Sequence, residues 1–206
     1  MQIMERKYYN DRLSSVVIDG IGDRQIRSRN FGGVEKRHPV TGKIVNGDGN
    51  RNFLLYLTPE IADELAQYGC EIRMTNVQGP NDVPEPFVAV TLSYYLSDQG
   101  LRPAPEVISV TNGVPTFLDK DHVKVLNDLD ISNMCLTLEI SAKEKEHQNG
   151  IKYHQVFATG IIANVASNYV NDQYGYLRNF GVQPAAAPQA SMTAPVGSNG
   201  DEVPFN

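Results

Sequence analysis

Short runs of β-branched and aromatic residues, separated by turn signals, constrain this chain more than any other feature of its sequence. The run at 87–95 (Phe-Val-Ala-Val-Thr-Leu-Ser-Tyr-Tyr) mixes both residue classes, as strands do. Turn-forming pairs such as Gly32-Gly33 and Asn149-Gly150 separate the runs. The sequence therefore predicts a mainly β fold. The predicted strands are 13–18, 26–31, 52–57, 71–77, 87–95, 107–111, 134–140 and 151–165.

One α-helix is well specified among these strands. Thr58 is placed to cap its N-terminus, Pro59 suits the first helical position, and Gly69 supplies a stop. Apolar residues at i, i+4 and i+7 give the segment one stripe that can pack on a sheet. The stripe consists of Ile61, Leu65 and Tyr68. A second, weaker helical turn is predicted at 121–129.

The segment 134–165 is typical of a long β-hairpin. Two strand-like runs flank a charged stretch, 143–150, which ends in an Asn-Gly turn pair. Many short strands, one short α-helix and irregular connections favour a small β-barrel or sandwich.

The composition changes after Phe180. Residues 183–200 carry no charge and consist mostly of Ala, Pro, Gln, Ser, Gly, Thr and Asn. Such a stretch cannot bury enough apolar surface to offset the entropy lost on ordering it. We therefore predict a folded domain at 1–180 and a disordered tail at 181–206.

The tip of this tail differs from the uncharged linker before it. Its two carboxylates, rigid proline and aromatic ring have no neighbours in the tail that could bury them. A short peptide of this kind suits a basic-rimmed hydrophobic pocket on another protein. The tip is therefore predicted to dock on protein partners. Its residues are Asp201, Glu202, Val203, Pro204 and Phe205.

Composition argues against several classes of function. With 18 Lys and Arg against 24 Asp and Glu, the overall charge does not predict nucleic-acid binding. Cys70 and Cys135 stand far apart and outside any Cys/His cluster, which predicts two buried thiols and no structural metal. The motifs of phosphate loops, nucleophile elbows and zinc proteases are missing from the sequence. We therefore expect no enzyme activity and no cofactor.

Two further expectations concern location. No apolar run is long enough to span a membrane as a helix. Residues 1–10 are polar and charged, unlike the apolar stretch of a signal peptide. A soluble, intracellular protein is expected.

The segment from Arg24 to Phe53 reverses the overall charge balance. It has a local net charge of +5, from seven basic residues and two acidic ones. Arg27, Arg29 and Phe31 alternate, so they share one face if the segment is a strand. Cations attract phosphates and flat rings stack on unpaired bases, which favours single-stranded nucleic acid. The alternative interpretation is that the basic residues are merely solvated and that Phe31 and Phe53 belong to the core.

The triplet Arg-Asn-Phe occurs twice in this segment. Arg29-Asn-Phe-Gly-Gly33 is followed by Gly49-Asn-Arg-Asn-Phe53, a strand and the short helix. Together with the runs 86–92, 117–121 and 129–133, this order resembles the helix-destabilising, single-stranded-DNA-binding proteins of tailed phages. The resemblance covers about residues 25–165. One motif departs from it: Ile140-Ser-Ala-Lys-Glu144 stands where this family commonly has Pro-Tyr-x-Trp. Base stacking on that strand would therefore be lost, or moved to residues such as Tyr153 or Phe157.

The tip carries a second resemblance. Bacterial single-stranded-DNA-binding proteins have an acidic tip that ends in Asp-Ile-Pro-Phe, and Val203-Pro204-Phe205 after two acidic residues is similar to it. Here Asn206 follows the phenylalanine, so the free carboxylate is displaced by one residue.

These resemblances imply an OB-fold, a five-stranded β-barrel, that binds single-stranded DNA without sequence preference. They also imply a role in phage DNA replication and recombination in the cytoplasm of a bacterial host, with the tail recruiting phage or host proteins of these processes. The implied nucleic-acid-binding residues are Arg27, Arg29, Asn30, Phe31, Arg37, His38, Lys43, Arg51, Phe53, Tyr56 and Tyr94.

Two other classes of function fit the same sequence. One is a protein-interaction module with an OB-like domain, and the other is a recombination protein that anneals complementary strands. RNA is an alternative ligand, because nothing in the sequence reports on the 2′-hydroxyl.

Overall fold

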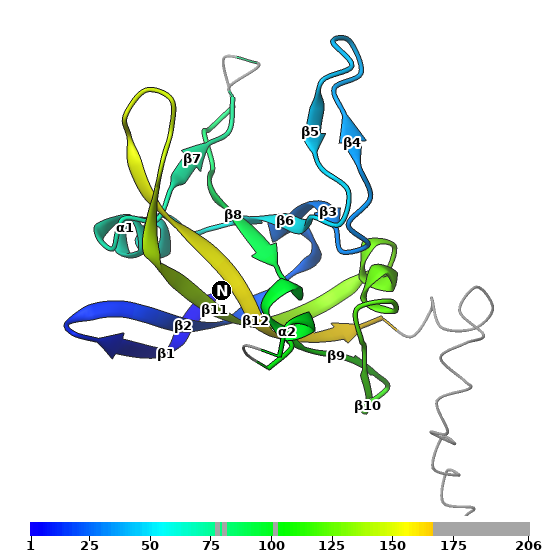
Figure 1. Ribbon diagram of the computed structural model, residues 1–206. Coiled ribbons are helices and arrows are strands. Elements are labelled where there is room, and N and C mark those ends of the chain that lie inside the picture. The colour runs from blue at the N-terminus through cyan, green and yellow to red at the C-terminus, as the bar shows by residue number, and fades with distance from the viewer. Residues whose placement is uncertain (77–78, 80–81, 101–102, 167–206) are drawn as a thin grey trace, which may run out of the picture.

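The chain is mainly β, as predicted, in a computed structural model that describes residues 1–76, 79, 82–100 and 103–166 (Figure 1). The whole predicted tail, 181–206, and the end of the predicted domain, 167–180, lie outside the described residues. The strands are β1 (Gln2–Tyr9), β2 (Arg12–Ile21), β3 (Ile26–Asn30), β4 (Lys36–Arg37), β5 (Ile44–Asn46), β6 (Arg51–Tyr56), β7 (Ile72–Met74), β8 (Pro86–Leu92), β9 (Glu106–Thr111), β10 (Val114–Phe117), β11 (Ile131–Glu146) and β12 (Lys152–Val165). The helices are α1 (Pro59–Gln67), α2 (Tyr95–Asp98) and the 3-10 helices η1 (Asp23–Gln25) and η2 (Val123–Asn127).

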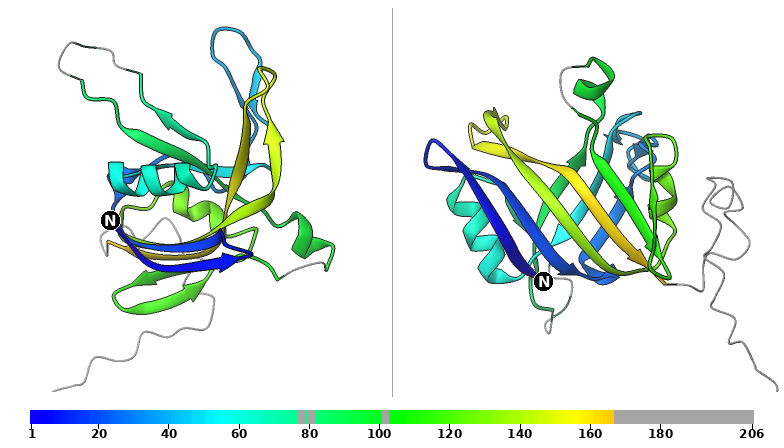
Figure 2. Two further views of the ribbon diagram at one scale, coloured as in Figure 1. Left: turned by 90° about the vertical axis from the view of Figure 1, so that its left-hand side faces the viewer. Right: turned by 90° about the horizontal axis from the view of Figure 1, so that it is seen from below.

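One sheet of ten strands organises the molecule. Its main path runs β1-β2-β11-β12-β8-β6-β3, with β9 joined to β12, β10 to β9 and β7 to β8. Most pairs are antiparallel, but β12 runs parallel to both β8 and β9. The sheet is strongly curved (Figure 2). Within the described residues the path begins at β1 and ends at β3 with no pairing between them, so the closed five-stranded barrel is not confirmed.

The core lies on the inward side of this sheet. Alternate residues of β6, β8, β11 and β12 are buried there, and α1 adds Ile61, Ala62 and Leu65. The helix begins at Pro59 and ends at Gln67, close to the predicted bounds. Gly69 follows it with a positive φ of +77°, where a Cβ atom would come within 2.8 Å of the His154 ring. Glycine is therefore required at this turn.

Strand β1 is absent from the prediction. It forms one edge of the sheet, and all of its residues except Ile3 are exposed. An edge strand without a buried face shows no alternation of apolar and polar residues, which is the signal that predicts a strand.

Other elements differ from the prediction at their ends. The predicted strand 87–95 stops at Leu92, and α2 begins at Tyr95. The C-terminal hairpin is confirmed, but β11 continues to Glu146, through the first half of the charged stretch predicted as its tip. The helical turn predicted at 121–129 is the 3-10 helix η2. Of the two free thiols, Cys70 is buried and Cys135 is half-buried.

Three hairpins project from the same side of the molecule (Figures 1 and 2). They are β4–β5, β7–β8 and the far end of β11–β12, and we call them the rim hairpins. None of the described helices is long and apolar enough to cross a membrane.

Candidate nucleic-acid interface

The outward side of β3, β6, β8 and β12 forms a continuous surface, here called the floor. These strands are neighbours in the sheet, and successive side chains of a strand point to opposite faces. Phe53 and Leu55 of β6 therefore face the core, while Tyr56 faces outward and is half-buried. In β8, Val88 is buried and Phe87 faces outward.

Tyr56 and Phe87 form a stacked aromatic pair on the floor. They lie opposite each other in the β6–β8 ladder, with ring centroids 5.5 Å apart and an interplanar angle of 21°. Both side chains are half-buried. Partly exposed aromatic rings of this kind are suited to base stacking by a single strand.

Strand β12 adds two aromatic residues to the floor. Tyr153 and Phe157 are half-buried and lie on the outward face. Between them, Gln155 donates a hydrogen bond from Nε2 to Oγ1 of Thr91 on β8, at 3.1 Å. This bond links β8 and β12 on the outward side. Tyr153 and Phe157 are the two residues predicted from the sequence as alternative positions for base stacking.

Two depressions adjoin the floor. The larger, of about 710 Å³, lies between β3, β6 and the β7–β8 hairpin and is lined by Arg27 and Tyr56 together with Asp82 and Glu85. The smaller, of about 140 Å³, lies between β7, β8 and β12 and is lined by residues that include Glu71, Arg73, Thr91, Tyr153 and Gln155. Aromatic, cationic, anionic and hydrogen-bonding groups therefore meet along the floor.

Exposed cations come from β3 and the β4–β5 hairpin. Arg27 lies on the floor beside Leu54 of β6, and its Nε donates to the carbonyl oxygen of Arg24 at 2.8 Å. Arg37 is 57% exposed and pairs with Glu35. Lys43 is also exposed. These predicted phosphate contacts lie at the surface, where a nucleic-acid backbone could reach them.

His38 has a local structural role at the end of the β4–β5 hairpin. Its Nδ1 accepts hydrogen bonds from the backbone N–H groups of Val40 and Thr41, at 3.3 and 3.2 Å. The residue is exposed as a whole.

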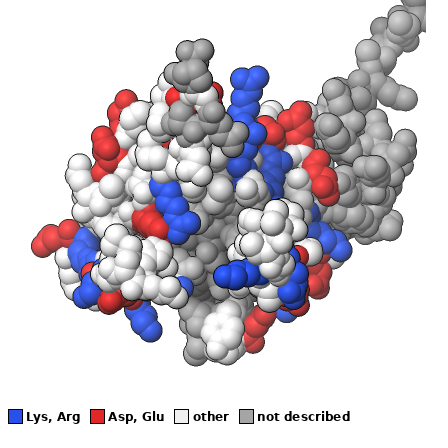
Figure 3. All heavy atoms as spheres, turned by 90° about the horizontal axis from the view of Figure 1, so that it is seen from above, with Lys and Arg blue, Asp and Glu red and all other residues white. Residues whose placement is uncertain are grey.

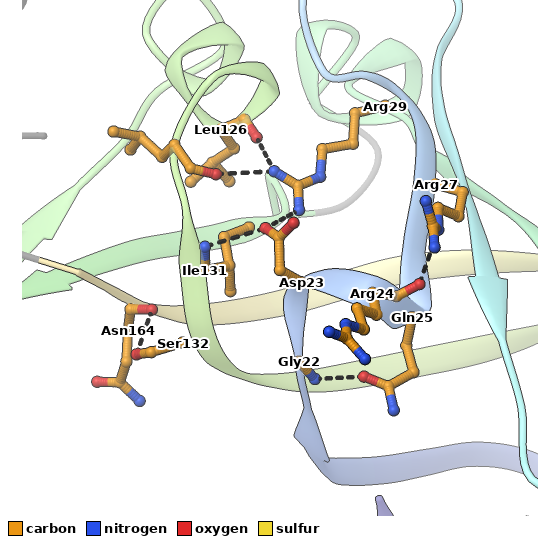
Figure 4. A network of polar contacts seen from close by, with 11 residues as sticks. Gly22, Asp23, Arg24, Gln25, Arg27, Arg29, Leu126, Ile131, Ser132 and Asn164 are labelled. Atoms are coloured by element: carbon orange, nitrogen blue, oxygen red, sulfur yellow. Dashed lines mark hydrogen bonds and ion pairs between the residues drawn. The ribbon is translucent and has the colours of Figure 1, made fainter.

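Arg29 does not lie on the floor as a free cation. Its guanidinium donates to the carbonyl oxygen of Leu129 at 2.8 Å and forms an ion pair with Asp23, and its side chain is only 12% exposed (Figure 4). Burial acts to raise the pKa of Asp23, but hydrogen bonds from Arg29 and the backbone of Ile131 outweigh it and lower that pKa. Arg29 is thus an anchor between β3 and the segment before β11, which corrects its predicted role.

Asn30 and the two phenylalanines of the repeated triplet are also structural. Phe31 and Phe53 are 0% and 1% exposed, with ring centroids 5.2 Å apart. They pack in the core, so the stacking role predicted for them is wrong. Asn30 is 2% exposed, and its amide bonds to both backbone groups of Val34.

The same motif fixes the base of the β4–β5 hairpin. The N–H of Gly49 donates to the carbonyl oxygen of Gly33 at 2.8 Å. A Cβ atom on Gly33 would lie 3.0 Å from the carbonyl carbon of Gly49, and Gly33 has a φ of +70°. Both facts require glycine at position 33, two residues after the first triplet.

Arg51 and Tyr94 form a pair beside the core. The Arg51 guanidinium lies over the Tyr94 ring, 5.2 Å from its centroid, and also donates to the carbonyl oxygen of Lys120 at 3.1 Å. Tyr94 is 6% exposed, and burial raises its pKa to about 12. Stacking of a base on Tyr94 would need this ring uncovered, so its predicted role is corrected to a structural one.

Two residues on or beside the floor are missing from the predicted binding residues. Phe87 of the floor was assigned only to a strand, and Arg73 lies beside the floor on β7, opposite Phe87 in the β7–β8 ladder. The available signal was the strand parity of β8, since Phe87 and the buried Val88 must face opposite ways.

Charges of both signs occupy the side of the molecule that carries the rim hairpins. Figure 3 shows Lys and Arg interspersed with Asp and Glu there. In the described part of the chain, no group of three or more His, Cys, Asp or Glu residues could hold a metal ion. The floor is therefore a surface of aromatic and mixed polar character.

Comparisons with known proteins give one remote likeness. No protein-family model matches the sequence, and no curated protein matches it. Among solved structures, the chain is similar to a single-stranded DNA-binding protein from bacteriophage Enc34, with 9% sequence identity and a TM-score of 0.44. The match covers 79% of this chain and 89% of that one. A likeness this remote assigns neither a family nor a function.

Proposed function

We propose that this protein binds single-stranded DNA without sequence preference along the floor, between the rim hairpins. The observation that carries the proposal is the stacked and half-buried pair of Tyr56 and Phe87 beside the exposed Arg27. Stacking supplies affinity that does not depend on base identity, and cations supply phosphate contacts. A duplex hides the faces of its bases, so such a surface favours single strands.

The path along the floor follows from the positions of these groups. Bases would stack at Tyr56 and Phe87 on β6 and β8 and at Tyr153 and Phe157 on β12. The phosphates would lie near Arg27 and the exposed cations of the β4–β5 hairpin. Arg29, Asn30, Phe31, Phe53, Arg51 and Tyr94 would support this surface from beneath.

The wider role is proposed from the sequence. We infer protection and organisation of single strands during phage DNA replication and recombination in a bacterial host. Asp201, Glu202, Val203, Pro204 and Phe205 would recruit phage or host proteins of these processes. Both inferences rest on the resemblance of the motifs and of the tip.

A fluorescence-anisotropy titration tests the proposed activity. A labelled oligo-dT strand is titrated with the full chain at about 50 and 300 mM salt, beside a duplex of equal length. We expect binding to the single strand that is much tighter than to duplex and that weakens steeply with salt. Absence of binding at the lower salt would contradict the proposal and leave the protein-interaction module. Annealing of complementary strands, measured in the same samples, would point to a recombination protein.

A further inference from the structure

A compact cluster of charged and aromatic side chains lies at the end of the floor, where β7 meets the β11–β12 hairpin. The carboxylate Oε1 of Glu71 lies 2.7 Å from Nε of Arg73 and 2.9 Å from Nε2 of His147. The Arg73 guanidinium and the His147 imidazole therefore contact the same carboxylate oxygen. The Glu71 side chain is 25% exposed, whereas that of Arg73 is 52% exposed.

Arg73 and His147 stabilise the negative charge of the Glu71 carboxylate. Burial acts to raise its pKa, but the hydrogen bonds from Arg73 and His147 outweigh burial and lower it. Because Glu71 Oε1 is an acceptor, Nε2 of His147 must carry the hydrogen. An oxygen anion that receives N–H groups from an arginine and a histidine has the surroundings of a bound phosphate oxygen.

An aromatic platform adjoins this anion position. The His147 ring is stacked on Tyr153, with centroids 4.4 Å apart and an interplanar angle of 18°. Tyr153 also lines the small depression of about 140 Å³, together with Arg73, Gln155 and Thr91. One aromatic ring, one hydrogen-bonding amide and one guanidinium thus border the same space.

The cluster is continuous with the proposed binding surface. Arg73 lies opposite Phe87 in the β7–β8 ladder, and Phe87 stacks on Tyr56. A single strand that follows the floor from Tyr56 towards β12 would therefore bring a phosphate to Arg73. In the free protein that place is already taken by the Glu71 carboxylate.

We propose that Arg73, His147 and Tyr153 form a nucleotide subsite, which Glu71 keeps closed in the free protein by standing in for a backbone phosphate. This inference rests on the proposed function. A phosphate of the single strand displaces the carboxylate from Arg73 and His147, and the adjoining base contacts Tyr153. Glu71 then lowers the affinity, because its own ion pairs must be given up before the phosphate binds.

The substitution Glu71→Gln tests this competition, since glutamine keeps the shape and can still accept hydrogen bonds while the charge is removed. Glu64→Gln is the matched control. Glu64 is equally 25% exposed and pairs with Arg6 of β1, away from the floor. Both variants lose one negative charge, so any general gain in attraction to DNA is common to them.

We expect Glu71→Gln to bind a labelled dT oligomer about fivefold more tightly than Glu64→Gln at low salt. Adding Arg73→Ala should abolish this gain and reduce the salt slope of binding by about one. If Glu71 only fastens the hairpin, Glu71→Gln will bind no more tightly than Glu64→Gln, which overturns the subsite while wild-type binding still supports the proposed function. An unchanged slope with Arg73→Ala also overturns it. If no form of the protein binds, the proposed function itself fails, and the subsite with it.

Discussion

Arg29 donates a hydrogen bond of 2.8 Å from its guanidinium to the carbonyl oxygen of Leu129, one hundred residues further along the chain. Arg27, on the same strand, is exposed and bonds to the nearby carbonyl oxygen of Arg24. The two arginines look equivalent in the sequence, but the structure gives one a tertiary contact and leaves the other at the surface. Substitution of Arg29 should therefore lower the stability of the fold, whereas substitution of Arg27 should weaken DNA binding and leave stability nearly unchanged.

Arg29→Ala should destabilise the fold by about 2–3 kcal/mol, because it removes the donor to the carbonyl of Leu129 and one of the two donors to the carboxylate of Asp23, which keeps the N–H of Ile131. Arg27→Ala should change the free energy of unfolding by less than about 0.5 kcal/mol, as an exposed substitution. Urea denaturation of the two variants measures both values. Equal stabilities would contradict the anchoring role of Arg29.

Arg27→Ala should instead weaken binding of single-stranded DNA and reduce the salt slope by about one, because one phosphate contact is lost. Lys7→Ala on β1 is a charge-matched control, since Lys7 is exposed at the far edge of the sheet. Anisotropy titrations at several salt concentrations give the slopes. If Lys7→Ala reduces the salt slope as much as Arg27→Ala does, Arg27 contributes to DNA binding only through the net charge of the protein and makes no specific phosphate contact.

The sequence predicted the class of fold because most strands alternate clearly. One face of β2, β6, β8, β11 and β12 is buried, so apolar residues recur with a period of two. Strand β1 has no such face and was missed. The order of the strands in the sheet, including the parallel pairing of β12 with β8, depends on contacts between distant segments that periodicity does not encode.

The surface positions of the predicted binding residues were predicted less well than the fold, for a reason visible in the Arg-Asn-Phe triplets. A basic and aromatic pattern is consistent with a DNA-binding surface and equally with an anchored arginine beside core rings. Phe31 and Phe53 are buried, and Tyr56, three residues after Phe53, faces outward. To decide between a DNA-binding surface and a structural role, one must know which face of the strand each side chain is on and which groups each guanidinium contacts, such as Asp23 for Arg29.

Tyr56→Ala should weaken binding of a dT oligomer by about 1–3 kcal/mol, the usual contribution of one stacked base. Tyr56→Phe keeps the ring and its stack on Phe87, so it should bind nearly as well as the wild type. The free energy of unfolding of both variants is measured alongside, which separates lost stacking from lost stability. Equal affinities for Tyr56→Ala and Tyr56→Phe would remove this ring from the proposed interface.

Tyr94 should be the origin of a loss of stability at alkaline pH. Burial raises its pKa to about 12, with the Arg51 guanidinium opposing and Asp119 adding to the shift, whereas a tyrosine in the unfolded chain titrates near about 10. The folded state therefore holds the Tyr94 hydroxyl proton more tightly than the unfolded chain does. The resulting contribution to the free energy of unfolding is fully present below the tyrosine pKa of the unfolded chain. It is lost as the pH rises from that value through the pKa of Tyr94 in the folded protein.

Tyr94→Phe removes the titrating hydroxyl but keeps the ring under Arg51. We expect the variant to lose less stability than the wild type between about pH 10 and 12. In a spectroscopic pH titration of the folded protein, the rise in tyrosinate absorbance of the variant should also be smaller by one tyrosine at the alkaline end. If both proteins lose stability in parallel and give the same titration curve, Tyr94 ionises as an ordinary tyrosine and is not enclosed by its neighbours.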